Sequence, residues 1–190
     1  MTNTRSLIIP ALAMTIVIVA SNILVQYPLP GVALGVTLGD WLTYGAFTYP
    51  FAFLVTDLTN RGQGAAAARR VAYIGFALAV VLSFVLADPL IALASGTAFL
   101  TAQLLDVSIF NALRKGVWWQ APLISSAIAA AIDTVLFFSI AFAGTGLPWV
   151  TMSIGDYAAK IAMVLLLLIP YRIGMSFVMD RDARVAGTFS

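Results

Sequence analysis

Two aspartates, Asp106 and Asp133, lie inside long apolar stretches of the sequence, one on each side of a short basic and aromatic turn at 114–120. A charged side chain at the centre of a lipid bilayer costs about 2.5–3.5 kcal/mol on insertion scales, so carboxylates in such stretches indicate function. The pair could line the path of a ligand or of a proton. The alternative is a structural role, with each carboxylate hydrogen-bonded to Ser, Thr or Gln side chains of neighbouring helices.

Polar and aromatic residues share helix faces with the two aspartates. In the first stretch, at 100° per residue, Gln103, Phe110 and Arg114 fall within about 20° of one line, and Asp106 lies about 60° from it. This arrangement predicts a polar stripe that runs down one helix to its basic end.

The second apolar stretch has a similar face. Asp133 and Phe137 each fall within about 20° of a line through Ser126. Small residues flank this line, and small side chains let another helix or a flat ligand approach closely. Ser126 is therefore a candidate ligand contact, although a packing role is the simpler interpretation of a serine.

Two further pairs of charged residues have a spacing of four, which places both members on one helix face. Asp57 and Arg61 are the first pair, and Asp156 and Lys160 are the second. An ion pair between Asp156 and Lys160 would reduce the cost of burying the lysine in a membrane. The alternatives are that Lys160 reaches outward to the lipid headgroups and that Asp156 only caps its helix.

The composition places the chain in the membrane class. Of its 190 residues, 62% are hydrophobic and 9% are charged, against about 45–50% and about 25% in soluble domains. The chain has no cysteine and no histidine, which excludes disulfides, thiol catalysis, histidine-based metal sites and Ser-His-Asp chemistry. No Walker-type phosphate loop is present, and we expect no metal and no cofactor.

The apolar stretches predict an all-α, polytopic membrane protein with six transmembrane helices in a single domain spanning residues 1–190. The expected ranges are 7–26, 41–58, 70–87, 89–114, 121–143 and 156–179. The first is long enough to span a bilayer, which needs about 20 residues, and the competing interpretation is a cleaved signal peptide. Pro50 inside the second range predicts either a kink or a helix broken next to a binding site.

The connections carry turn residues. Gly62 and Gly64 are expected to end the second helix, and Asp88-Pro89 is expected to start the fourth as N-cap and first helical residue. Residues 27–40, with their prolines and glycines, form either an external loop or a short re-entrant segment. Residues 144–155 are expected to form a loop.

The basic residues predict the orientation. Nine of the ten Lys and Arg residues fall on one side of the six spans, and the tenth is Lys160. Since cytoplasmic loops carry the excess of Lys and Arg, both termini are expected in the cytoplasm.

Three sequence blocks resemble a known family: WLTYGAFTYPFAFLVTDLTNR with the following ARR at 41–70, AFLTAQLLDVSIFNALR at 98–114, and WWQAPLISSAIAAAIDTVLFFSIAF at 118–142. A weaker fourth is DYAAK at 156–160. Together they cover about two-fifths of the chain, and they are similar to the bacterial queuosine precursor transporter family, also called the vitamin uptake transporter family.

This resemblance implies a six-helix protein of the bacterial inner membrane that imports 7-cyano-7-deazaguanine, 7-aminomethyl-7-deazaguanine or both for the queuosine modification of tRNA. The family's motif residues correspond in this chain to Asp57, Asn60, Arg61, Gln103, Asp106, Asn111, Arg114, Ser126, Asp133, Thr134, Asp156 and Lys160. Of these we expect seven to bind substrate together with Phe137: Asp57, Gln103, Asp106, Asn111, Ser126, Asp133 and Lys160. We expect Arg61, Arg114 and Asp156 to have structural roles.

The chemistry of the expected substrate suits these residues. A deazaguanine presents ring N–H and exocyclic NH₂ donors on one edge, and a carboxylate can accept both. We hypothesise that Asp106 and Asp133 form the centre of the site, with Gln103 serving the ring carbonyl and Phe137 beside the flat ring. A second carboxylate could receive the cation of the aminomethyl form.

Three classes of protein remain open. The first is a stand-alone transporter in which the carboxylates also bind a coupling proton. The second is a substrate-binding membrane subunit of an ATP-driven uptake complex. The third, an intramembrane aspartyl protease, is disfavoured because neither aspartate has the Tyr-Asp or Gly-x-Gly-Asp setting of that class. We therefore expect a non-enzyme whose partners are the lipid bilayer and a small molecule but no nucleic acid, with a homodimer left open.

Overall fold

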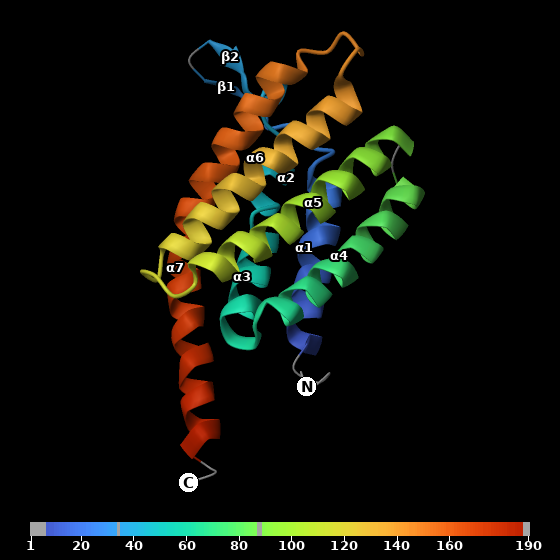
Figure 1. Cartoon of the computed structure of the whole chain (residues 1–190). Helices are drawn as coiled ribbons and strands as arrows, with labels where there is room; N and C mark the ends of the chain where they lie inside the picture. The colour runs from blue at the N-terminus through green and yellow to red at the C-terminus, as the bar shows by residue number, and fades with distance from the viewer. Residues whose placement is uncertain (1–6, 34, 87–88, 188–190) are drawn as a thin grey trace.

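Prolines, glycines and polar residues divide the chain into helices, which the computed structural model describes over residues 7–33, 35–86 and 89–187. In these ranges the helices are α1 (Ile8–Leu24), α2 (Gly45–Thr48), α3 (Phe51–Gln63), α4 (Ala65–Leu86), α5 (Pro89–Leu113), α6 (Gln120–Phe142) and α7 (Trp149–Gly187). A short antiparallel hairpin of β1 (Val32–Ala33) and β2 (Val36–Thr37) follows α1 and leads into a 3₁₀ turn at Leu38–Asp40. Figure 1 shows the long helices packed side by side, with the hairpin at one end of the bundle.

The expected second span, 41–58, is two helices instead of one. α2 ends at Thr48 and α3 begins at Phe51, because Pro50 between them has no backbone N–H to continue a helix. α3 then runs past the expected end to Gln63 and stops at Gly64, which has a φ of 85°. Glycine adopts positive φ without steric cost, so Gly64 ends the helix and Gly62 does not.

The last helix begins earlier than expected. α7 starts at Trp149, directly after Pro148, so much of the predicted loop at 144–155 is helical. Proline is favoured at a helix start because its missing N–H has no intrahelical partner there. Asp156 therefore lies inside α7, and the interpretation of this residue as a helix cap is wrong. α7 also continues through Pro170 to Gly187, beyond the expected end at 179.

The other boundaries are close to the expectation. α4 starts at Ala65, before the expected residue 70, because a run of four alanines, the best helix formers, precedes its arginines. α5 starts at Pro89 as expected, while the predicted cap, Asp88, lies outside the described residues. The segment at 27–40 contains the β1–β2 hairpin, which the sequence did not predict.

Apolar side chains face outward from this bundle and polar side chains face inward. Among the described residues, α5, α6 and Trp149–Phe177 of α7 are long and apolar enough to cross a membrane. Large apolar side chains are exposed along the outer faces, for example Ile9, Leu166 and Ile169. Buried positions hold carboxylates, amides and a lysine. This distribution suits a lipid environment, in which exposed polar groups are costly.

Small residues bring the helices close together. Gly75 of α4 faces Met14 and Ile18 of α1, and Gly155 of α7 faces the backbone of Trp41. Close approach at small residues is the usual way in which helices pack in membranes. α5 and α6 pack on each other through buried alanines, including Ala102 and Ala129.

Gly155 provides a test of this packing. A Cβ atom at this position would lie 2.6 Å from the Trp41 carbonyl oxygen, a backbone atom that cannot turn away. We expect Gly155→Ala to destabilise the purified protein by about 1–3 kcal/mol, as overpacking does, measured by thermal unfolding in detergent. Gly96→Ala is the matched control, because its Cβ would meet Phe76 at an ordinary 3.5 Å. Equal stability of the two variants would contradict the packing described here.

Candidate functional site

A buried lysine is surrounded by two carboxylates in the interior of the bundle. Lys160 Nζ of α7 lies 2.8 Å from Asp133 Oδ2 of α6 and 2.5 Å from Asp156 Oδ2 of α7, and it donates to Thr134 Oγ1 at 3.1 Å. Lys160 and Asp133 are each less than one-tenth exposed. The expected Asp156–Lys160 ion pair is therefore confirmed, and the outward orientation of Lys160 is excluded.

Further hydrogen bonds fix the carboxylates of this cluster. The Tyr49 hydroxyl donates to Asp133 Oδ1 at 2.7 Å, and the Thr134 hydroxyl donates to Asp156 Oδ2 at 2.8 Å. The Lys160 ammonium also lies 5.0 Å from the centre of the Tyr49 ring. With one positive and two negative groups, the cluster has a net charge of −1 when all three are ionised. We call these five residues, Tyr49, Asp133, Thr134, Asp156 and Lys160, the lysine cluster.

The lysine cluster forms part of the wall of a large cavity of about 450 Å³. Ligand pockets are commonly about 300–1,000 Å³ and mostly apolar, with a few polar groups that orient the ligand. Here the apolar wall is aromatic, and the residues that supply it are Tyr49, Phe99, Phe137, Phe138 and Phe142. Other polar lining groups come from Ser21, Asn22, Gln26, Thr43 and Ser95. The cavity can hold a flat molecule of the size of a nucleobase.

The lining residues locate the cavity within the bundle. Asn22 and Gln26 lie at the C-terminal end of α1, Phe142 ends α6, and Met152 lies in the first turn of α7. All of these positions are at the end of the bundle away from the basic turn at 114–120. The cavity therefore lies in the half of the protein opposite the basic residues.

A second polar group lies nearer the basic end, around two other aspartates. The Ser126 hydroxyl of α6 lies 3.4 Å from Asp57 Oδ2 of α3 and 3.4 Å from Asp106 Oδ1 of α5. The Thr56 hydroxyl lies 3.4 Å from Asp106 Oδ2 and 3.1 Å from Gln103 Oε1. All five side chains are buried. We call these residues the carboxylate cluster; they are Thr56, Asp57, Gln103, Asp106 and Ser126.

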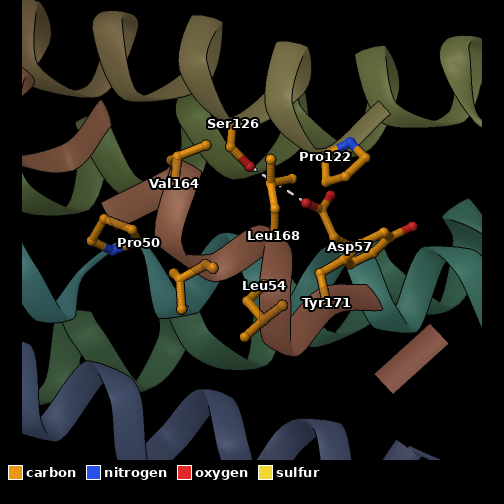
Figure 2. A pocket seen from close by; sticks show the side chains of 9 residues that line it. Pro50, Leu54, Asp57, Pro122, Ser126, Val164, Leu168 and Tyr171 are labelled. Carbon is orange, nitrogen blue, oxygen red and sulfur yellow. Dashed lines mark hydrogen bonds between the residues drawn. The ribbon is translucent and has the colours of Figure 1, made fainter. Parts of the chain in front are cut away.

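A small cavity of about 10 Å³ adjoins this cluster, with room for about one water-sized particle. Figure 2 shows Asp57 and Ser126 pointing toward each other in its wall, with Tyr171 and Pro122 nearby. Neither Asp57 nor Asp106 lines the large cavity. The two clusters thus belong to different spaces.

The structure separates the two aspartates that were expected to form the centre of one site. Ser126 lies opposite Asp106, and Asp133 is seven residues further along α6, about 10 Å at 1.5 Å per residue. The tight turn after α5 sets this register, which brings Phe99 rather than Asp106 to the cavity with Asp133. The expectation of one centre containing Asp106, Asp133 and Gln103 is therefore not met by the geometry.

Two arginines join three helices at the basic end. Arg61 Nη1 donates to the Arg114 carbonyl at 2.6 Å, and Arg114 Nη2 donates to the Arg61 carbonyl at 2.9 Å. Arg61 Nε also donates to the Tyr171 hydroxyl at 3.0 Å, and its guanidinium lies 5.6 Å from the centre of the Phe110 ring. The spacing of Asp57 and Arg61 suggested that they pair with each other, but Arg61 uses its donors between α3, α5 and α7.

The remaining predicted residues are placed as follows. Phe137 is half-buried and lines the large cavity, in contact with Phe138. Asn111 is exposed on the surface of α5 and lines neither cavity described here. Within the described residues, no group of three or more His, Cys, Asp or Glu side chains is placed to hold a metal ion.

Sequence reasoning missed Tyr49 and Thr56. Tyr49 immediately precedes Pro50, and the broken-helix interpretation of that proline was the available signal that a site lies there. Thr56 is a single hydroxyl in an apolar block and has no distinguishing pattern in the sequence.

Residues 43–88 and 83–174 match a protein family described as "Putative vitamin uptake transporter". The chain belongs to this vitamin uptake transporter family. The matched ranges include both clusters and the Arg61–Arg114 contact.

Three curated relatives agree with this assignment. The "Queuosine precursor transporter" of Escherichia coli (strain K12) is 33% identical over 88% of this chain and 86% of its own length. The "Probable queuosine precursor transporter" of Haemophilus influenzae is 35% identical over 81% of this chain and 79% of its own. A protein of the same name from Bacillus subtilis is 28% identical over 75% of each chain.

No solved structure shows a significant similarity to the chain. Membership of a transporter family and the apolar, membrane-length helices together establish a multi-pass membrane protein.

Proposed function

We propose that the protein imports queuosine precursors, 7-cyano-7-deazaguanine and 7-aminomethyl-7-deazaguanine, and binds them in the large cavity beside the lysine cluster. The observation that carries the proposal is Asp133, a carboxylate held in place by Lys160 and Tyr49 in the wall of an aromatic cavity of about 450 Å³. The names of the relatives supply the substrate class.

The cavity has the groups that a deazaguanine needs. Its ring N–H and exocyclic NH₂ are adjacent donors, and a carboxylate such as Asp133 accepts both. Phe99, Phe137 and Phe138 supply flat apolar surface for the ring system. Ser95 offers a hydroxyl for the ring carbonyl, in place of Gln103, which does not line this cavity.

The two precursors differ in charge, and the net negative charge of the lysine cluster favours the positively charged one. The aminomethyl form carries an ammonium group, and the cluster has one more negative than positive group. All three ammonium hydrogens of Lys160 have acceptors in Asp133, Asp156 and Thr134, so the lysine does not serve as a donor to the substrate. Its role is to hold Asp133 in one orientation.

The proposed topology has six spans, with α2 and α3 together forming the second and both termini in the cytoplasm of a bacterium. The contact between Arg61 and Arg114 supports it, because it brings two of the basic helix ends together. The positive-inside rule then places this end in the cytoplasm and the cavity toward the outside of the inner membrane. That arrangement suits import.

A stand-alone transporter is the class that we propose. The names of the relatives give no support to the alternative expectation, a substrate-binding subunit of an ATP-driven complex.

Binding to the purified protein tests the proposal. We expect saturable binding of both deazaguanines by isothermal titration calorimetry, tighter for the aminomethyl form because of the net negative charge of the lysine cluster. Guanine is the comparison ligand, and Asn111→Ala, at an exposed position outside both cavities, is the control variant. Absence of binding of either deazaguanine to the folded wild-type protein would overturn the proposed function.

A further inference from the structure

The two hydroxyls of the carboxylate cluster have fewer hydrogens than its two carboxylates have oxygens, and Gln103 Nε2 has no hydrogen-bond partner among the described residues. A hydroxyl has a single hydrogen to donate, yet the Ser126 hydroxyl is equally far from Asp57 and Asp106. The Thr56 hydroxyl faces four acceptors: the Ala52 and Phe53 carbonyls at 3.1 and 3.0 Å, Gln103 Oε1, and Asp106 Oδ2. These two hydroxyls supply two hydrogens for four carboxylate oxygens.

Among the described residues, no basic side chain forms a salt bridge with Asp57 or Asp106. Lys160 forms its ion pairs with Asp133 and Asp156, and these do not reach Asp57 or Asp106. Asp57 is 2% exposed, and its Oδ1 atom has no hydrogen-bond partner among the described residues. Two ionised carboxylates at one buried site repel each other strongly. A proton or a cation at this site would remove that repulsion.

The charged and titratable groups around the site come from three helices. α5 contributes Asp106 itself and, at its end, Arg114. α7 contributes Tyr171, which lines the small cavity with Asp57. On α3, Arg61 lies one turn beyond Asp57 and donates to Tyr171 and to the Arg114 carbonyl. The residues of α6 in the cavity wall, Pro122 and Ser126, are uncharged.

We propose that Asp57 and Asp106, with the Ser126 hydroxyl between them, bind one monovalent cation, a proton or Na⁺, and that its binding drives substrate accumulation. A proton would sit on one carboxylate and bridge to the other. Na⁺ would be held by oxygens alone, which carboxylate, hydroxyl and amide groups supply here, and hard cations take such ligands. The inference rests on the proposed transport function and adds a coupling site distinct from the substrate cavity.

The structure links the two sites through shared helices. α6 carries both Ser126 and Asp133, and α5 carries both Asp106 and Phe99. Binding of a cation in the carboxylate cluster removes repulsion between α3 and α5. Both helices also contribute lining residues to the substrate cavity, and α6 carries its aspartate, Asp133. These shared helices are the route by which occupation of one site can act on the other.

Transport by the full chain reconstituted into liposomes shows whether a proton or Na⁺ is the coupled cation. We expect accumulation of labelled aminomethyl-deazaguanine against its gradient when either an inward proton gradient or an inward Na⁺ gradient is imposed, and the effective gradient identifies the cation. Asp106→Asn and Asp57→Asn keep the side-chain shape but remove a charge. In both variants we expect loss of gradient-driven accumulation, with substrate binding and exchange of internal for external substrate retained. Asp40→Asn, at an exposed aspartate, is the matched control.

A measurement on the wild-type protein tests the coupling site even if the variants do not fold. If the cation is a proton, adding substrate to the purified protein in weak buffer should change the pH, and if it is Na⁺, Na⁺ should raise the affinity for substrate. Wild-type binding that is insensitive to both cations, or accumulation by the aspartate variants equal to that of wild type, would overturn the coupling site. Wild-type protein that binds no deazaguanine would overturn the proposed function instead, so the two failures are distinguishable.

Discussion

Replacing Asp133 by asparagine is expected to reduce uptake of both deazaguanine precursors to background in cells that cannot synthesise them. The asparagine keeps the volume of the side chain and still accepts a hydrogen bond from Tyr49, so the cavity keeps its shape. What is lost is the charge and one of the two acceptor atoms. Lys160 retains Asp156 as a partner at 2.5 Å, so the interior is not left with an unpaired cation.

The size of the effect follows from the hydrogen bonds. A hydrogen bond to a charged group contributes about 1.5–3 kcal/mol, and about 1.4 kcal/mol is a tenfold change in affinity. With two ligand donors facing Asp133, the affinity should fall by about 100-fold or more. Titration of the purified variant measures this loss directly.

The control for Asp133→Asn is the same substitution at Asp40, which is exposed in the 3₁₀ turn after β2. Asp40→Asn should take up substrate like the wild type at equal amounts of protein in the membrane. Wild-type uptake by cells carrying Asp133→Asn would place the substrate site elsewhere.

Replacing Lys160 by methionine is expected to have the largest effect on stability. Methionine fills most of the space, but Asp133 and Asp156 are then buried without a cation. Removing one partner of a buried ion pair typically costs about 3–5 kcal/mol. We expect little folded protein in the membrane, and loss of the monodisperse peak in size-exclusion chromatography.

A triple variant separates the charge from the packing. Replacing buried ion pairs by neutral groups of similar volume is often neutral or stabilising. Lys160→Met combined with Asp133→Asn and Asp156→Asn should therefore recover folded protein without recovering uptake. Lys115→Met, at an exposed lysine, should behave like the wild type. A single Lys160→Met variant as stable as the wild type would show that Lys160 does not compensate the two carboxylates.

Local spacing predicted local contacts well. The Asp156–Lys160 pair was predictable because four residues on one helix fix the distance between the side chains, whatever the helix packs against. Pro50 and Gly64 were readable for a similar reason, since their backbone chemistry acts at the residue itself. The same spacing misled for Asp57 and Arg61, because Arg61 has alternatives on α5 and α7 that the sequence does not reveal.

The grouping of the aspartates could not be predicted in this way. It depends on the register between α5 and α6, and a shift of a few residues in the turn decides which side chain lies opposite Asp106. The sequence identified Asp57, Asp106 and Asp133 as unusual but not which of them share a space. Tyr49 was missed because its partner, Asp133, lies 84 positions away.

The reciprocal contact of Arg61 and Arg114 has a consequence for the transport cycle. Each guanidinium satisfies a carbonyl near the C-terminal end of the other residue's helix, where carbonyls lack partners within the helix and cations are favoured. The described conformation therefore joins α3 and α5 on the side of the basic residues and holds its large cavity on the other side. Release of substrate to the basic side requires α3 and α5 to part, which breaks both contacts in one step. Under the proposed transport function, these two hydrogen bonds contribute to the stability of the described conformation relative to one that is open on the basic side.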